Sequence, residues 1–271
     1  MKTKYKIFFA RQIYRILSLF FSNNFIFKRK NIYWNIDLSE AIDLHIFLFG
    51  SFEREIKDTA DKLEYKDYKT ILDIGANFGV QALQFADNFR DAKIFAIEPT
   101  KYAFDKMKKN LKLNPQLSKN IHIDQAFLSS NEKKIPPSVY SSWDLKSIDE
   151  QHPKHKGFKK DTINSNIFTL DEYVNSNKIE NVDFIKLDVD GSELNVLKGG
   201  ENFLKKCKPP IFMELAPYLY KEFGYNINDL INFLVSIDYK FYDIKKIKLI
   251  EDIGRYSENI KDGSSKNILI Y

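Results

Sequence analysis

Two short apolar runs with a glycine-containing turn between them dominate the hydrophobic pattern of residues 70–100. Residues 70–74 and residues 93–97 are each almost entirely apolar, which predicts two buried strands. Between them, Val80, Leu83 and Phe85 recur at the spacing of one helix face. The order predicts a strand, a tight turn, a helix and a second strand, which is the unit that many nucleoside cofactors bind.

Charged residues at the ends of these strands distinguish two classes of cofactor. Asp73, at the mouth of the turn, would repel the pyrophosphate that a dinucleotide places there. It would instead attract the sulfonium and ammonium groups of S-adenosylmethionine, while Glu98 could accept hydrogen bonds from both ribose hydroxyls. Asn77 replaces the middle glycine of the turn and leaves less room for a phosphate. The predicted cofactor is therefore S-adenosylmethionine, and the turn and its neighbour supply further contacts: Gly75, Ala76, Asn77, Phe78, Gly79 and Pro99.

A second group of acidic residues follows the apolar residues 184–187. Asp188 and Asp190 come directly after this predicted strand, with Glu193 three residues further on, and Glu214 ends another predicted strand at residues 210–213. The carboxyl ends of parallel strands meet at one edge of a sheet, so these acids are predicted to converge beside the cofactor turn. Clustered carboxylates usually imply a cation, a shared proton or a substrate amine nearby. Asp190 could instead cap the following helix.

Residues 121–127 alternate between apolar and polar and predict a third strand that ends near Phe127. Phe127 is placed either to flank the adenine ring or to pack in the core. The polar segment 131–166 that follows predicts an inserted loop on the substrate side of the sheet. His152, His155 and the neighbouring lysines could bind a phosphate-bearing acceptor there, and the alternative is a mobile basic surface loop.

Residues 1–50 predict an amphipathic helical extension or cap, because apolar residues recur at helical spacing and Arg11 and Arg15 interrupt them. The uncharged part is too short to span a bilayer, and no signal-peptide pattern is present. The helix is predicted to pack on the domain or on a partner subunit, with contact to a membrane surface as the alternative. Glu53, just before the cofactor unit, could approach the methionine end of the cofactor or lie in solvent at a helix N-terminus.

Length and composition limit the number of domains and indicate the redox compartment. The 271 residues fit one α/β domain, residues 51–271, with the extension before it. The single Cys207 excludes an intrachain disulfide and indicates a reducing compartment, so we expect a cytoplasmic protein that could lie at the membrane surface. The net charge of +5 suits an anionic small substrate, nucleic acid or a membrane equally well.

Four motifs in this order resemble the FkbM family of class I S-adenosylmethionine-dependent methyltransferases. They are LDIGANFG at residues 72–79, AIEP at 96–99, TLDEY at 169–173 and KLDVDGSELNVLKGG at 186–200. The resemblance covers roughly residues 50–215, and Asp190 stands where the family usually has Glu. It implies an α/β, Rossmann-like sheet of seven strands, mostly parallel with the last strand antiparallel, flanked by helices. Residues 240–243 and 267–271 would be the last two strands. It also implies O-methylation of hydroxyls on small molecules, including sugars and polyketides.

A sugar hydroxyl is too weak an acid to lose its proton unaided, so the reaction needs either a general base or a divalent cation that lowers the pKa of the hydroxyl. Asp188, Asp190 and Glu214 are predicted as catalytic residues and as ligands of Mg²⁺ or Mn²⁺, with His152 as a further catalytic candidate. Asp188 is also predicted to bind the cofactor. We expect an O-methyltransferase acting on a sugar or nucleotide sugar of surface polysaccharide biosynthesis. The alternatives are a nucleic-acid methyltransferase and a non-catalytic membrane-associated module. An acidic pocket binds a polyanion poorly, which disfavours the nucleic-acid methyltransferase.

Overall fold

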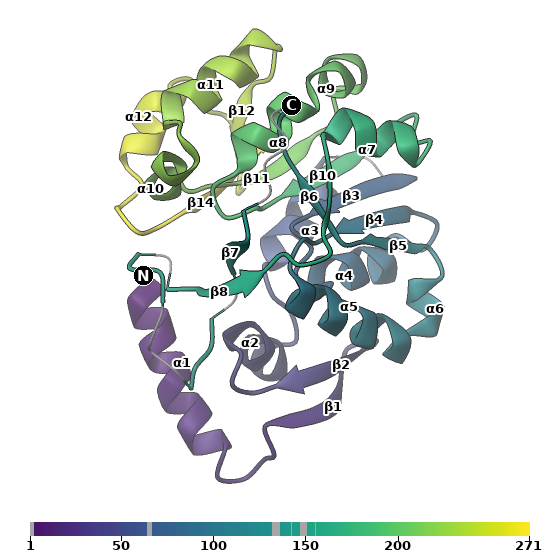
Figure 1. The fold of residues 1–271 in the computed structure, drawn as a ribbon, viewed down its shortest axis with the longest axis vertical. Coiled ribbons are helices and arrows are strands. Elements are labelled where there is room, and N and C mark those ends of the chain that lie inside the picture. Colours follow the sequence, from purple (N-terminus) through teal and green to yellow (C-terminus); the bar gives the residue numbers. More distant parts are fainter. Residues whose placement is uncertain (1–2, 64–66, 132–135, 142, 147–150, 155) are drawn as a thin grey trace.

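The computed structural model describes residues 3–63, 67–131, 136–141, 143–146, 151–154 and 156–271. Its main sheet is built from eight strands: β3 (Thr70–Ile74), β4 (Lys93–Ile97), β5 (Ile121–Asp124), β10 (Phe184–Leu187), β11 (Ile211–Leu215), β12 (Phe241–Asp243), β13 (Lys248–Leu249) and β14 (Lys266–Ile270). The strand order is β13-β12-β14-β11-β10-β3-β4-β5 (Figure 1). The cofactor turn thus follows a strand in the middle of the sheet.

Strand directions confirm the predicted fold and correct its strand count. The five strands from β5 to β11 are mutually parallel, and β14 runs antiparallel to both β11 and β12. These seven strands are the predicted sheet, with β12 and β14 near the positions expected for its last two strands. The eighth strand, β13, is a two-residue edge strand that pairs antiparallel with β12. Its burial pattern is fully exposed, so no apolar run marked it in the sequence.

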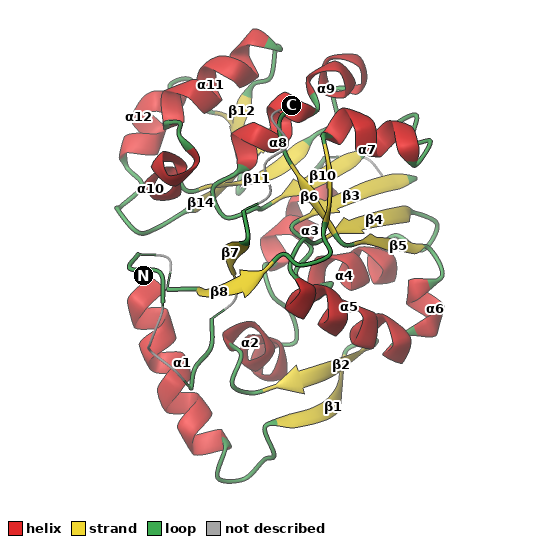
Figure 2. Cartoon of the chain, in the orientation of Figure 1, coloured by secondary structure: helices red, strands yellow, loops and turns green. Residues whose placement is uncertain are grey.

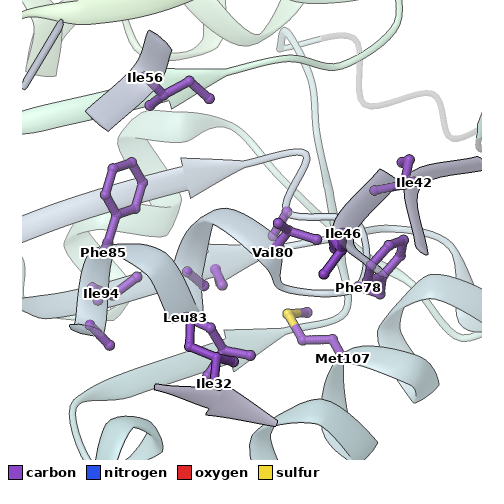
Figure 3. Close-up of a cluster of buried hydrophobic side chains, with 14 of the residues drawn as sticks. Ile32, Ile42, Ile46, Ile56, Phe78, Val80, Leu83, Phe85, Ile94 and Met107 are labelled. Atoms are coloured by element: carbon purple, nitrogen blue, oxygen red, sulfur yellow. The ribbon is translucent and has the colours of Figure 1, made fainter. Parts of the chain in front are cut away.

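Helices cover both faces of the sheet (Figure 2). The helices that follow the N-terminal segment are α3 (Arg54–Lys62), α4 (Val80–Asn88), α5 (Lys101–Leu113), α6 (Pro115–Ser118), α7 (Leu170–Ser176), α8 (Glu193–Gly199), α9 (Glu201–Cys207), α10 (Pro217–Tyr220), the 3-10 helix η1 (Lys221–Phe223), α11 (Ile227–Ser236) and α12 (Ile253–Glu258). Because side chains alternate across a strand, Ile71 and Ile94 join one apolar core, whereas Leu72 and Phe95 join the other. The first core includes Leu83 and Phe85 of α4 (Figure 3).

The N-terminal segment, predicted as a helical extension or cap, includes a β-hairpin between its two helices. It consists of α1 (Thr3–Leu17), a hairpin of β1 (Asn24–Arg29) and β2 (Ile32–Asp37), and α2 (Ala41–Phe49). Ile32, Trp34 and Ile36 alternate with more exposed residues and are buried, a strand pattern that brings this segment into the first core. α2 ends at Gly50, whose φ of 79° suits glycine. The division of the chain at residue 50 stays a prediction.

The segment after β5 differs from the predicted strand and loop. The predicted strand 121–127 stops at Asp124, and β6 (Ala126–Leu128) leaves the main sheet to pair with β9 (Asn166–Phe168). Within the predicted insertion, β7 (Ser138–Ser141) and β8 (Phe158–Asp161) form an antiparallel pair. His155 lies outside the described residues. Among the described helices, none is long and apolar enough to cross a membrane.

Candidate functional site

The turn between β3 and α4 depends on residues that tolerate positive φ. Gly75, Asn77 and Gly79 have φ values of 78°, 50° and 80°. A Cβ added to Gly75 would lie 1.8 Å from the carbonyl oxygen of Asp188, so the turn packs directly against the end of β10. Only glycine fits this close approach of two backbones.

The backbone N–H groups of this turn donate hydrogen bonds to other atoms of the protein. Gly75 and Ala76 both donate to the carbonyl oxygen of Ile97 at 3.0 Å. Asn77 donates to Oε2 of Glu98 at 2.9 Å, and Phe78 donates to the Asn77 side chain at 2.9 Å. A dinucleotide turn needs such groups for its pyrophosphate, whereas here they already have acceptors. The geometry therefore favours a cofactor without a pyrophosphate, as the charges in the sequence predicted.

Glu98 follows β4 and lies buried on the cavity wall beside the turn. Its Oε1 accepts hydrogen bonds from Thr100 N and Thr100 Oγ1, at 2.9 and 2.5 Å, and its Oε2 accepts from Asn77 N. Burial raises the pKa of Glu98, and these hydrogen bonds oppose the shift. Since a carboxylate oxygen accepts about two hydrogen bonds, Oε2 retains capacity for one more donor, such as a ribose hydroxyl.

Lys186 is a buried cation that the sequence analysis missed. Its Nζ donates to the carbonyl oxygen of Gly75 at 2.7 Å and lies 3.5 Å from Asp188 Oδ2 and 3.7 Å from Asp73 Oδ1. Burial alone would lower the pKa of Lys186, but Asp188, Asp73 and nearby glutamates outweigh it and raise that pKa. A lone lysine in the apolar strand 184–187 was the available signal, since a buried cation needs anionic partners.

Asp73 lies beneath the turn, fully buried, rather than on the cavity wall. Burial raises the pKa of its carboxyl group, while Lys186 opposes the shift. The side chain faces the same side of the sheet as Ile71, two residues earlier, and this places it behind the turn. The structure therefore brings Asp73 to Lys186 and leaves the direct cofactor contact as a prediction.

Three predicted acids converge at the carboxyl ends of β10 and β11. Ligand oxygens of Asp188, Asp190 and Glu214 lie within 4.8 Å of one another. Ser265 Oγ donates to Glu214 Oε1 at 2.5 Å, and burial together with Asp188 raises the pKa of Glu214 well above its ordinary value. We call these three residues the carboxylate cluster. Like charges this close favour a bound proton or cation.

Two further glutamates have strongly raised pKa values near the carboxylate cluster. Glu53 precedes α3 with a φ of 51°, and burial and Asp188 raise its pKa to about 8. Glu193 is fully buried at the start of α8, and burial raises its pKa to about 8 as well. Its Oε1 accepts from the N–H groups of Val189 and Gly191, both at 3.2 Å, so it holds the loop that carries Asp190.

A cavity of about 980 Å³ lies beside the cofactor turn, Glu98 and the carboxylate cluster. The predicted residues that line it are Glu53, Gly75, Ala76, Asn77, Glu98, Pro99, Phe127, Asp188, Asp190 and Glu214. One of its walls is apolar and comes from α1 and α2, including Phe9, Ile13 and Leu48. Another is polar and comes from the C-terminal strands, including Lys266 and Asn267. Tyr218 and Trp143, which sequence reasoning did not select, also line the cavity.

Other predicted residues lie away from the cavity wall. Phe78 is buried in the first core under Lys106, whose Nζ lies 4.3 Å from the ring centroid, and Gly79 packs on Met107. His152 is buried, with Nε2 at 2.7 Å from Glu222 Oε1 and its ring edge-on to Tyr140. The structure does not bring His152 to the carboxylate cluster, and its predicted catalytic role stays untested.

Together, the seven-stranded part of the sheet, in which β14 alone runs antiparallel, and the glycine turn followed by Glu98 define the class I fold of S-adenosylmethionine-dependent methyltransferases. The chain belongs to the FkbM family, because residues 73–241 match the model of the methyltransferase FkbM domain. This confirms the resemblance carried by the four motifs.

Among curated proteins, the chain is similar to methyltransferase sdnD of Sordaria araneosa, with 30% identity over 154 residues, and to methyltransferase 1 of Beauveria bassiana, with 23% identity over 154 residues. These matches cover 48% and 51% of this chain, and they span only 59% and 61% of the relatives. A crystal structure of an FkbM methyltransferase from Methylobacillus flagellatus KT is similar with a TM-score of 0.47 and 17% identity, over 76% of this chain and 44% of that chain.

Proposed function

We propose that this protein transfers a methyl group from S-adenosylmethionine to a hydroxyl group of a small-molecule acceptor. The observation that carries the proposal is the carboxylate cluster, which lies on the same cavity as the cofactor turn and includes a carboxyl group, Glu214, with a strongly raised pKa. Perturbed carboxyl groups in a cavity are typical of proton-transfer sites.

The residues present fit this cofactor. Oε2 of Glu98 can accept from a ribose hydroxyl, and Phe127 and Pro99 offer apolar surface for an adenine ring. Glu53 and Asp188 offer negative charge to the cationic end, where Lys186 is the nearby cation. When bound, S-adenosylmethionine supplies an already activated methyl group, so the protein's own residues must orient the acceptor and remove its proton.

Glu214 is the residue we assign to proton removal. A raised pKa makes the ionised form of this carboxyl group a stronger base than an ordinary carboxylate, and the cationic cofactor favours that ionised form when it binds. Ser265 fixes one of its oxygens by donating to Oε1, and the other oxygen can face the acceptor. Asp188 and Asp190 would orient the acceptor by accepting hydrogen bonds from its remaining hydroxyls.

The predicted acceptor, a sugar or nucleotide sugar, stays a proposal. The polar wall of the cavity supports it, because Lys266 and Asn267 offer donors for hydroxyl or phosphate oxygens. The apolar wall from α1 and α2 suits an apolar group attached to the same acceptor. We therefore favour an acceptor with a hydroxylated head and an apolar part.

A methyl-transfer assay over nucleotide sugars, free sugars and apolar glycosides tests this proposal. We expect Glu214→Gln to lower kcat by about 10²–10⁴-fold, because the amide cannot accept the proton. The matched control is Glu201→Gln on the exposed start of α9. Turnover by Glu214→Gln equal to that of the control would contradict the assignment.

The donor set of the carboxylate cluster also suits the Mg²⁺ or Mn²⁺ that the sequence predicts, since both ions prefer oxygen ligands. Such an ion would lower the pKa of the acceptor hydroxyl. Lys186, however, already gives Asp188 a cationic neighbour at 3.5 Å. We therefore expect chelation to lower activity by less than about twofold. A loss that Mg²⁺ or Mn²⁺ restores would assign the cluster to a metal instead.

A further inference from the structure

The first 36 residues differ from the rest of the chain in charge. They contain eight basic residues and no acidic ones, since the first acid is Asp37. The basic residues are Lys2, Lys4, Lys6, Arg11, Arg15, Lys28, Arg29 and Lys30. The remainder of the chain has more acids than bases. A segment with one sign of charge is suited to a partner of the opposite sign.

α1 is apolar on two opposite faces. Its inner face packs on the first core through the buried Ile7 and the partly buried Ala10, Tyr14 and Leu17. Its outer face is exposed, and the large apolar side chains there are Tyr5, Phe8, Phe9, Ile13 and Ile16. A surface helix usually buries its apolar face and keeps its other faces polar, so this second, exposed apolar face is unusual. In Figure 1, α1 runs along the outer edge of the molecule.

The connection between α1 and β1 extends this exposed surface. Leu19 and Phe20 are 79% and 76% exposed, the largest exposures among the large apolar side chains of the described residues. They are not in a loose tail, because Phe20 N donates to the carbonyl oxygen of Leu17 at 2.9 Å and Phe21 packs against Phe47. Holding such side chains in water is unfavourable, and exposed apolar patches of this kind mark interaction sites.

We propose that the outer face of α1 and the 19–20 turn form a docking surface for a bilayer that contains anionic lipids. Exposed apolar side chains in a segment that carries cations and no acidic residue of its own are the combination by which interfacial helices bind such bilayers. A second copy of the chain is the competing occupant. A symmetric dimer through this surface would bring two basic segments together, and the like charges would oppose association.

This surface continues into the cavity of the proposed site. Phe9, Ile13 and Phe49 have exposed side chains and also line the cavity. Docking would therefore place the mouth of the cavity against the bilayer. The docking surface itself does not depend on the proposed reaction, because lipid binding is measured without turnover.

Vesicle co-sedimentation of the full chain tests the proposal. We expect binding to phosphatidylcholine vesicles with about 30% phosphatidylglycerol, weaker binding to pure phosphatidylcholine, and loss of binding as salt is raised. Leu19→Ser with Phe20→Ser should weaken binding at least about tenfold. Arg15→Glu with Lys28→Glu should weaken it at least about 25-fold, from about fivefold for each cation lost.

Matched controls lie elsewhere on the surface. Val235→Ser removes an exposed apolar side chain from α11, and Lys112→Glu reverses an exposed charge on α5; both should bind vesicles like the unchanged protein. The thermal stability of each variant is measured as well, so that unfolding is not mistaken for lost binding. No binding to anionic vesicles, or binding that the two double variants leave unchanged, overturns the proposal. A dimer in solution that the Leu19 and Phe20 changes disrupt, without vesicle binding, assigns the surface to a second copy.

Discussion

Two buried charge clusters in this protein differ in how completely their charges are balanced. In the N-terminal region, Asp43 of α2 pairs with Lys106 of α5, and both side chains are almost fully buried. At the carboxyl edge of the sheet, Lys186 is the buried cation among several acids, which are Asp73, Asp188, Glu98 and Glu53. The first cluster is one direct ion pair with Glu40 as a further acid nearby, whereas the second sets several acids against one cation.

The difference separates a structural interaction from a site. Asp43 Oδ2 also accepts from the N–H of Asp37 at 2.8 Å, so the pair ties β2, α2 and α5 together. Burial raises the pKa of Asp43 to about 6, and Lys106 opposes that shift. At the sheet edge, by contrast, several pKa values are raised and the cavity is open to a ligand. An uncompensated cluster of this kind is ready to bind a cation.

Replacing Lys186 should give the largest effect. Lys186→Met leaves the surrounding carboxylates without their buried cation, so we expect the free energy of unfolding to fall by about 3–5 kcal/mol. Urea denaturation at pH 7 measures the change. At pH 5 part of the loss should be recovered, because protonation of these carboxyl groups removes their charge.

Double variants test whether the two clusters differ as described. Asp43→Leu with Lys106→Met removes both members of the direct ion pair, and we expect a net change within about 1.5 kcal/mol. Asp73→Leu with Lys186→Met should remain destabilised by several times that amount, because the buried Glu98 and the half-buried Asp188 are left without a cation. Equal stabilities of the two double variants would contradict the distinction.

Local sequence predicted the parts of the site that depend on neighbouring residues. The turn at residues 75–79 and the strand ends at Asp188 and Glu214 follow from short apolar runs and glycine spacing. The pairing of β6 with β9 joins residues about 40 positions apart, so no local pattern predicted it or the resulting break after Asp124. Whether Asp73 is buried depends on which side of the sheet its side chain faces and on the position of Lys186. Neither follows from the neighbouring residues in the sequence.

The hairpin of the N-terminal segment also could not be predicted in full from local sequence. The alternation of Ile32, Trp34 and Ile36 was visible in the sequence, yet its partner strand alternates only weakly. Asn110 of α5 and Asn114, the residue after α5, accept from backbone N–H groups of β2, at 2.9 and 2.8 Å, and fix that strand from a distant part of the chain. Tertiary contacts of this kind are not readable from local propensity.

Two glycines with nearly equal φ values extend the comparison of the two regions. A Cβ on Gly75 would meet the backbone oxygen of Asp188 at 1.8 Å, whereas a Cβ on Gly50 would meet the flexible side chain of Arg29 at 3.0 Å. We expect Gly75→Ala to cost about 3 kcal/mol and Gly50→Ala about 1 kcal/mol, since the left-handed strain is shared and only Gly75 forces two backbones apart. Thermal unfolding measures both.

Gly224 provides the control for strain alone, because its φ is 79° and no atom lies within 4 Å of an added Cβ. Gly224→Ala should therefore resemble Gly50→Ala. If Gly75→Ala were no worse than these two, the close contact between the turn and β10 would not limit stability.

The smallest expected effect concerns Glu53 and pH. Its pKa of about 8 means that the carboxyl group binds a proton at pH 7 in the free protein. A cationic cofactor favours the ionised form, so binding should release this proton. The dissociation constant for S-adenosylmethionine should then fall as pH rises from 6 toward 8, by up to about tenfold for each pH unit. Isothermal titration in buffers of different ionisation enthalpy measures the affinity and the proton release together.

The Glu53→Gln variant tests whether Glu53 itself, rather than a neighbouring carboxyl group, causes this pH dependence. The amide has no proton to release, so the pH dependence below 8 should become shallower, while Asp58→Asn, an exposed change on α3 away from the cavity lining, should retain the slope. An unchanged slope in Glu53→Gln would assign the titration to the carboxylate cluster. The excess negative charge at the sheet edge would then act through Asp188 and Glu214, and the segment between α2 and α3 would contribute shape rather than charge to the cofactor site.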